Sequence, residues 1–120
     1  MQKLCRYDEH ESEAECREYL SDMRDAIRPA LEFSKDVTFE EFRNNREKQF
    51  SIIHALEIVG EAAKQVPASV REEYPAIPWR DIVGMRDRLV HGYFSVNLER
   101  LWNTIRDDLP DLERKLNKKS

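Results

Sequence analysis

The sequence predicts an all-α protein, folded as an antiparallel bundle of four main helices with kinks. Apolar residues recur at steps of three and four along four separate segments, the spacing that gives a helix one buried face. The composition agrees, because 40% hydrophobic and 37% charged residues accompany only 3 Gly and 5 Pro among 120 residues. This length suits a single domain with a real core. Moderate connectors between the segments favour antiparallel neighbours.

Composition excludes several classes of protein. No apolar run approaches the roughly 20 residues that cross a bilayer, so we expect a cytoplasmic protein without a membrane segment. Cys5 and Cys16 have no neighbouring thiol or histidine at a metal-ligand spacing, so reduced thiols are expected and neither a metal nor a cofactor is predicted. The net charge of -4 argues against a broad basic surface for nucleic acid, but it leaves room for a small basic cleft.

The first helix is expected over residues 13–33. Proline removes a backbone donor and crowds the preceding turn, so a kink is predicted at Pro29. Residues 1–12 show no sustained period and are expected to form a flexible N-terminal arm, which leaves residues 13–117 as the single helical domain. The apolar stripe keeps its helical phase through Pro29 and comprises Cys16, Tyr19, Leu20, Met23, Ile27, Ala30 and Leu31.

The second helix has a clear start signal. Thr38 with Glu41 three residues later is the signature of a capping box, which predicts an N-cap at Thr38. The helix is expected to run from there to about Val66, because Pro67 follows. Gly60, near its end, leaves room for another helix to approach closely.

A third, short helix is expected after a connector at residues 68–78. It begins at about Trp79 and ends near His91, because Gly92 is the usual type of residue just past a helix end.

The last helix is expected to begin after Asn97, a plausible N-cap residue. Pro110 interrupts its backbone without changing the phase of the apolar stripe, which predicts a second kink. The stripe comprises Leu98, Leu101, Trp102, Ile105, Leu109, Leu112 and Leu116.

Arg86 interrupts the apolar face of the third helix. It follows Trp79 by seven residues and therefore lies within about 20° of it around the helix. A buried guanidinium needs a partner, which could be a carboxylate of the fold or an anion that the protein handles. Glu57 and Glu61, four residues apart on the second helix, repel each other, so at least one of them is expected to face a cation. A purely structural pair between Arg86 and one of them is therefore one interpretation.

His91 gives the same helix a second chemical group. It lies about 140° around the helix and about 7.5 Å along it from Arg86, so both reach one phosphate only if the arginine extends toward the helix end. Asp87, four residues before His91, could orient the imidazole. This set suits metal-independent RNA cleavage, in which His91 moves a proton and Arg86 stabilises charge on the phosphorane. Spacing alone leaves open a structural role for His91 as a helix-end cap.

A resemblance to a known family adds to this reading. The run Arg86-Asp87-Arg88-Leu89-Val90-His91-Gly92-Tyr93 matches the R-x4-H-x-Y motif of HEPN-domain ribonucleases and resembles the HepT toxins of HepT/MntA toxin-antitoxin pairs. Further similar stretches stand in the same order at residues 58–63, 77–80, 84–86 and 108–112. The resemblance covers roughly residues 17 to 116. It implies a HEPN-like domain that forms a homodimer, in which the two Arg/His motifs line one cleft, and an RNase that is toxic to its own cell.

The same resemblance implies a partner. In a type VII-like pair, an MntA-like nucleotidyltransferase antitoxin adenylylates the tyrosine two residues after the motif histidine, here Tyr93. AMP groups add bulk and negative charge, which would repel an RNA phosphate beside the cleft. The chain departs from the family in having Asp87 where Asn is commonest directly after the motif arginine.

The remaining candidate residues have weaker signals. Arg80 and Arg88 are either solvated or in contact with RNA. Trp79 and Trp102 are expected as core or interface anchors and His54 as a surface or interface histidine. An alternative function is a non-catalytic helical partner or substrate-binding module of a nucleotidyltransferase, and a third is a plain dimerisation domain. The sequence does not identify the RNA that would be cut.

Overall fold

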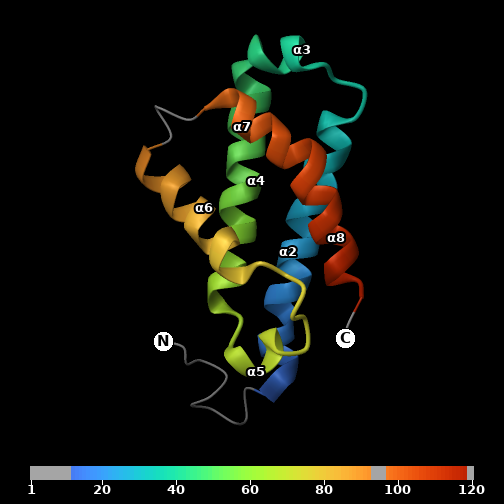
Figure 1. The fold of residues 1–120 in the computed structure, drawn as a ribbon, viewed down its shortest axis with the longest axis vertical. Coiled ribbons are helices and arrows are strands. Elements are labelled where there is room, and N and C mark those ends of the chain that lie inside the picture. Colours follow the sequence, from blue (N-terminus) through green and yellow to red (C-terminus); the bar gives the residue numbers. More distant parts are fainter. Residues whose placement is uncertain (1–11, 93–96, 119–120) are drawn as a thin grey trace.

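All regular elements of the described chain are helices. The computed structural model describes residues 12–92 and 97–118, with side chains from residue 17 onward. Its main helices alternate in direction, as Figure 1 shows, which confirms the all-α class and the predicted bundle. None of the helices in these ranges is both long and apolar enough to span a membrane. The main helices are α2 (Ser12–Ser34), α4 (Arg46–Gln65), α6 (Trp79–Gly92) and α8 (Leu109–Leu116).

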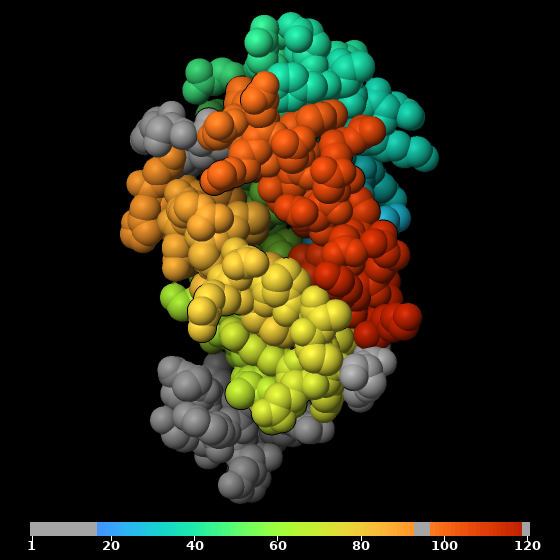
Figure 2. Space-filling view, viewed as in Figure 1, coloured from blue at the N-terminus to red at the C-terminus, as the bar shows by residue number. Residues whose placement is uncertain are grey.

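Helix α4 lies at the centre of the bundle. It packs against α2 on one side and α6 on another, while α8 packs against α2. On the face shown in Figure 2, a hollow separates α6 from the C-terminal helical segment, and α4 is visible at its floor. Each fully buried Leu, Ile or Phe contributes about 1.5–3 kcal/mol, so the large core side chains fix this arrangement. They are Phe42, Leu20, Met23, Ile27, Ile52, Leu56, Ile105 and Leu116.

Helix α2 confirms the first predicted helix. It continues through Pro29, and the kink predicted there stays a prediction. Two arginines of α2 join it to the end of α8, because Arg24 donates a hydrogen bond of 2.6 Å to the Leu116 carbonyl and Arg28 pairs with Glu113 at 2.9 Å. The predicted arm lies outside the described residues up to residue 11, and Ser12 already belongs to α2.

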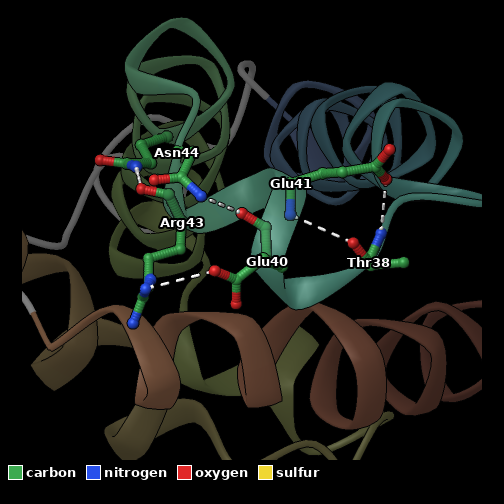
Figure 3. Close-up of polar contacts among 6 residues, drawn as sticks. Thr38, Glu40, Glu41, Arg43 and Asn44 are labelled. Carbon is green, nitrogen blue, oxygen red and sulfur yellow. Dashed lines mark hydrogen bonds and ion pairs between the residues drawn. The ribbon is translucent and has the colours of Figure 1, made fainter.

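The second predicted helix is in fact two helices, α3 (Phe39–Arg43) and α4. The capping box at its start is confirmed, with both reciprocal bonds between Thr38 and Glu41 visible in Figure 3. The prediction of one helix was wrong because Asn44 and Asn45 compete for backbone groups. The Asn44 amide donates to the Glu40 carbonyl at 2.9 Å, and the Asn45 side chain accepts from the backbone N–H of Lys48, which caps α4.

The connector before α6 contains a short helix that was not predicted, α5 (Ala68–Arg71). Two apolar side chains of the connector, Tyr74 and Ile77, are buried. Helix α4 ends at Gln65, with Val66 as its C-cap, as Pro67 predicted. The connector therefore holds the start of α6 close to the core.

The last predicted helix is continuous but irregular. Asn97 caps it as expected, because its side chain accepts the backbone N–H of Arg100 at 3.0 Å. The segment consists of α7 (Leu98–Asn103), a π-helical turn η3 (Thr104–Asp108) and α8. The irregularity thus lies one turn before Pro110, at carbonyls that would otherwise receive a bond from the missing proline N–H.

Candidate active site on helix α6

Helix α6 carries Arg86 on the side that packs against the bundle. Trp79, Ile82 and Leu89 of the same helix are buried in the core. The Arg86 side chain is 23% exposed, so its position on the apolar face is confirmed. A partly buried guanidinium keeps its charge and is held in one place more firmly than a surface arginine.

Gly60 makes the position of Arg86 possible. A Cβ atom at Gly60 would lie 2.1 Å from the Arg86 Cβ and 2.7 Å from its Cγ, distances too short for carbon atoms that are not bonded to each other or to a common atom. Helices α4 and α6 can therefore approach this closely only because residue 60 has no side chain. The predicted close approach at Gly60 is confirmed, and the helix that approaches is the one carrying Arg86.

Two carboxylates hold the end of the Arg86 side chain. Its Nη2 atom lies 2.9 Å from Oε1 of Glu61, and its Nη1 atom lies 3.0 Å from Oδ1 of Asp87. The side chains of Glu61 and Asp87 are 51% and 50% exposed, so water screens both ion pairs. The structural pairing of Arg86 with Glu61 is therefore real. Asp87 was expected to orient His91. Among the described residues its carboxylate pairs with Arg86 instead.

Arg86 lines a groove between α2, α4 and α6, here called the Arg86 groove. Its volume is about 720 Å³. The apolar side chains of Ile58 and Val90 lie at this groove and are 39% and 42% exposed. Arg86 is the only cation among its described lining residues, whose carboxylates are Asp22, Asp25, Glu57 and Glu61. The groove therefore combines an apolar surface with an acidic one.

His91 lies in a different groove, between α6 and α7, here called the His91 groove. It is exposed in the last turn of α6. The groove has a volume of about 420 Å³, and Arg88 and Arg100 line it from the two sides. Arg86 is not among its lining residues. One chain thus presents the two motif residues to separate grooves.

The other predicted site residues are distributed unevenly. Arg80 is exposed in the first turn of α6, whereas Arg88 is exposed at the His91 groove. Tyr93, the expected modification site, lies outside the described residues. His54 is exposed on α4, as expected, with its Nδ1 4.0 Å from Glu57.

Both tryptophans pack structurally, as expected. Trp79 is buried, and its Nε1–H donates to the Tyr74 carbonyl at 3.2 Å. Burial lowers the pKa of the neighbouring Arg71, whose guanidinium lies over the Trp79 ring. Trp102 packs against Phe39 and Phe42 in tilted arrangements, with ring centroids 6.1 and 5.1 Å away. Neither ring is therefore assigned to RNA.

Sequence reasoning did not select Arg100 as a site residue. It lies on α7 across the groove from Arg88, with Asn97 and Thr104 on the same wall. The helical spacing of these positions, three and four residues apart, predicts that they share a face. Only the packing of α7 beside α6 shows that this face meets His91.

Comparison with known proteins identifies the family. A family model described as Ribonuclease HepT-like matches residues 23–118. The chain belongs to the ribonuclease HepT-like family. Membership confirms the resemblance seen in the sequence and the predicted enzyme class, a ribonuclease.

Curated relatives of this family are similar over most of their length. "Probable ribonuclease HepT" of Thermococcus cleftensis is 42% identical over 102 residues, which cover 85% of this chain and 93% of the relative. A protein of Methanocaldococcus jannaschii named as a "Putative RNase" is 37% identical over 100 residues, covering 83% of this chain and 86% of its own. A third relative, a "Putative RNase" of Caldanaerobacter subterraneus subsp. tengcongensis, is 37% identical over 100 residues. These residues cover 83% of this chain and 89% of the relative. No solved structure matches the chain.

Proposed function

We propose that the protein is a metal-independent endoribonuclease toxin that acts as a homodimer, with Arg86 and His91 as its catalytic residues. The observation that carries the proposal is the placement of Arg86. A partly buried guanidinium is fixed at a groove by Gly60 and two carboxylates, on the same short helix whose last turn presents His91. Membership of a ribonuclease family supports RNA as the substrate.

The proposed reaction is transesterification within RNA. The His91 imidazole accepts the proton of a ribose 2′-hydroxyl while that oxygen bonds to phosphorus. The bond from phosphorus to the 5′ oxygen breaks, and a proton from an imidazolium or water neutralises this leaving group. Arg86 stabilises the negative charge that develops on the phosphorane oxygens, since a guanidinium matches their geometry. The products are a 2′,3′-cyclic phosphate and a 5′-hydroxyl.

The carboxylates on Arg86 are compatible with this role. A guanidinium has five N–H donors, and the two ion pairs occupy only part of this set. Both carboxylates are half exposed, so each pair contributes little energy and a phosphate can displace one of them. Glu61 and Asp87 thus hold the arginine in position when no RNA is bound.

Dimerisation would bring the two motif residues together. Within one chain, Arg86 and His91 lie at separate grooves. A second copy seated on the Arg86 groove would cover Ile58 and Val90, and in a symmetric dimer each copy contributes the same surface. We propose that Arg86 of one copy and His91 of the other form one catalytic pair.

Metal removal provides the direct test of the chemistry. Purified protein treated with EDTA is expected to cleave RNA at an unchanged rate, because a side chain moves the proton and another stabilises the charge. Gel analysis of end-labelled RNA would show the fragments, and their ends would be cyclic phosphate and 5′-hydroxyl. Loss of cleavage in EDTA with recovery on adding Mg²⁺ would contradict the proposal.

Neutralisation would occur at Tyr93, through an MntA-like nucleotidyltransferase. In the presence of that partner and ATP, the intact mass of the protein is expected to rise by one or more AMP units and cleavage to stop. The added phosphates place negative charge two residues from His91, which repels the RNA backbone. In the presence of the same partner and ATP, Tyr93→Phe should gain no AMP and should keep its cleavage activity. Modification of Tyr93→Phe to the same extent as the wild type would show that another residue is the target.

A second candidate function remains tied to one observation, the pairing of Arg86 with two carboxylates. Such pairing also suits a non-catalytic module that docks on a nucleotidyltransferase. In that case Arg86→Ala weakens the complex, and the wild-type protein cleaves no RNA.

A further inference from the structure

Two arginines line opposite sides of the His91 groove. Arg88 projects from α6 and Arg100 from α7, and both are exposed. Within the residues that the structure describes, neither guanidinium forms a salt bridge. Arg86, by contrast, already has two carboxylate partners. Unpaired guanidiniums that converge on one groove attract an anion.

Arg88 and His91 are also close along α6, with the Arg88 guanidinium extending toward Gly84, one turn before Arg88. The two residues are three apart on α6, so they are neighbours on the helix surface, about 4.5 Å apart along the axis. Arg100 is fixed on the opposite wall by two bonds of its backbone. Its N–H donates to the Asn97 side chain, and its carbonyl accepts from the Thr104 hydroxyl, both at 3.0 Å.

Arg88 and Arg100 stand where the His91 groove meets a neighbouring hollow, and they line both. No carboxylate is found among the described lining residues of the His91 groove. Beyond Arg88 and Arg100 it continues into the hollow seen in Figure 2. The lining of that hollow includes Asp81, Asp108 and Asp111. Burial, followed by the neighbouring charges of Asp107 and Asp111, raises the pKa of Asp108. This charge gradient directs a phosphate toward His91 and away from the acidic end.

We propose that Arg88 and Arg100 form a phosphate-binding subsite for RNA, which holds a backbone phosphate adjacent to the one that is cut. The subsite rests on the proposed ribonuclease function, because it gives that function its substrate contact. Arg88 was a candidate RNA contact in the sequence, and Arg100 is the residue that the structure adds. Both are binding residues that position RNA against His91.

The test measures binding separately from cleavage. A single-stranded oligonucleotide with 2′-deoxyribose at every position has the same phosphate backbone, and it binds without reacting because it has no 2′-hydroxyl. Arg88→Gln and Arg100→Gln are each expected to raise its dissociation constant about fivefold at low salt. The logarithm of the association constant decreases with the logarithm of the salt concentration, and this negative slope should become less steep by about 0.7 for each lost phosphate contact on a single strand. The matched control is Arg28→Gln. Arg28 is an exposed arginine of α2 that pairs with Glu113 of α8, and this variant should bind the oligonucleotide as the wild type does.

Kinetics on cleavable RNA give a second readout. Each variant should show a higher KM with a nearly unchanged kcat, because the subsite holds substrate and transition state equally. A lower kcat at unchanged KM would overturn the assignment, since the arginine would then act in the chemistry. Wild-type affinity in both variants would also overturn it, and would leave the proposed ribonuclease function intact if the wild type cleaves RNA. Binding that depends on both arginines in a protein without cleavage activity would support the subsite and refute the catalytic function.

Discussion

His91→Ala is expected to lower the rate of RNA cleavage about 100- to 10,000-fold, the usual contribution of a general acid or base. The change should leave the fold intact, because His91 is exposed in the last turn of α6 and is not part of the core. Cleavage rates of end-labelled RNA at saturating concentration measure the loss. Circular dichroism during thermal unfolding checks that the helices and the melting temperature are retained.

His54→Ala is the matched control, because His54 is also exposed but lies on α4. It should cleave RNA at the wild-type rate. Full activity of His91→Ala would refute the proposed mechanism, whatever the activity of the control.

Mixing two inactive variants tests whether the site is built across the dimer. Arg86→Ala and His91→Ala, mixed in equal amounts after unfolding and refolding, should regain about a quarter of the wild-type activity. Half of the dimers in a random mixture contain one copy of each variant, and each of these has one intact site of two. If Arg86 acts with His91 of its own chain, every site in the mixture lacks one residue and activity stays at the level of the variants alone.

Gly60→Ala is expected to lower the free energy of unfolding by about 1–2 kcal/mol, although alanine favours a helix by about 1 kcal/mol over glycine. The new methyl group would lie 2.1 Å from the Arg86 Cβ. Because both atoms are anchored close to a helix backbone, α4 and α6 must separate to relieve the overlap. This separation also moves Arg86, so RNA cleavage should fall together with stability. Urea unfolding at one fixed protein concentration measures the change, since dimerisation makes stability depend on concentration.

Gly84→Ala provides the matched comparison on α6. A Cβ atom at Gly84 would lie 3.5 Å from Nη1 of Arg88, the far end of a flexible side chain. This substitution should therefore raise the free energy of unfolding by about 0.5–1 kcal/mol through helix propensity. Equal stability of Gly60→Ala and Gly84→Ala would contradict the tight approach of α4 and α6.

Local signals predicted the helix starts correctly where capping chemistry decides them. Thr38 with Glu41 and Asn97 each satisfy backbone N–H groups within a few residues, so the sequence contains the whole interaction. The break at Asn44 and Asn45 was missed although the apolar stripe is interrupted between Phe42 and Phe50, because the apolar positions on the two sides were assigned to one helix. Its cause is a competition between side-chain and backbone hydrogen bonds, which an apolar pattern does not record.

The sequence by itself determined the helical class, the ribonuclease family and the unusual position of Arg86. The family depends on the order of the motif residues. The helical class and the position of Arg86 depend on the 3.6-residue period within single helices. Tertiary structure alone decided the partner of Arg86, the groove that each motif residue faces and the meeting of Arg100 with Arg88. These depend on the register between helices, which is fixed by close packing at points such as Gly60. Residues on different helices carry no sequence spacing that reports this register, so their chemistry becomes visible only when α4, α6 and α7 are packed together.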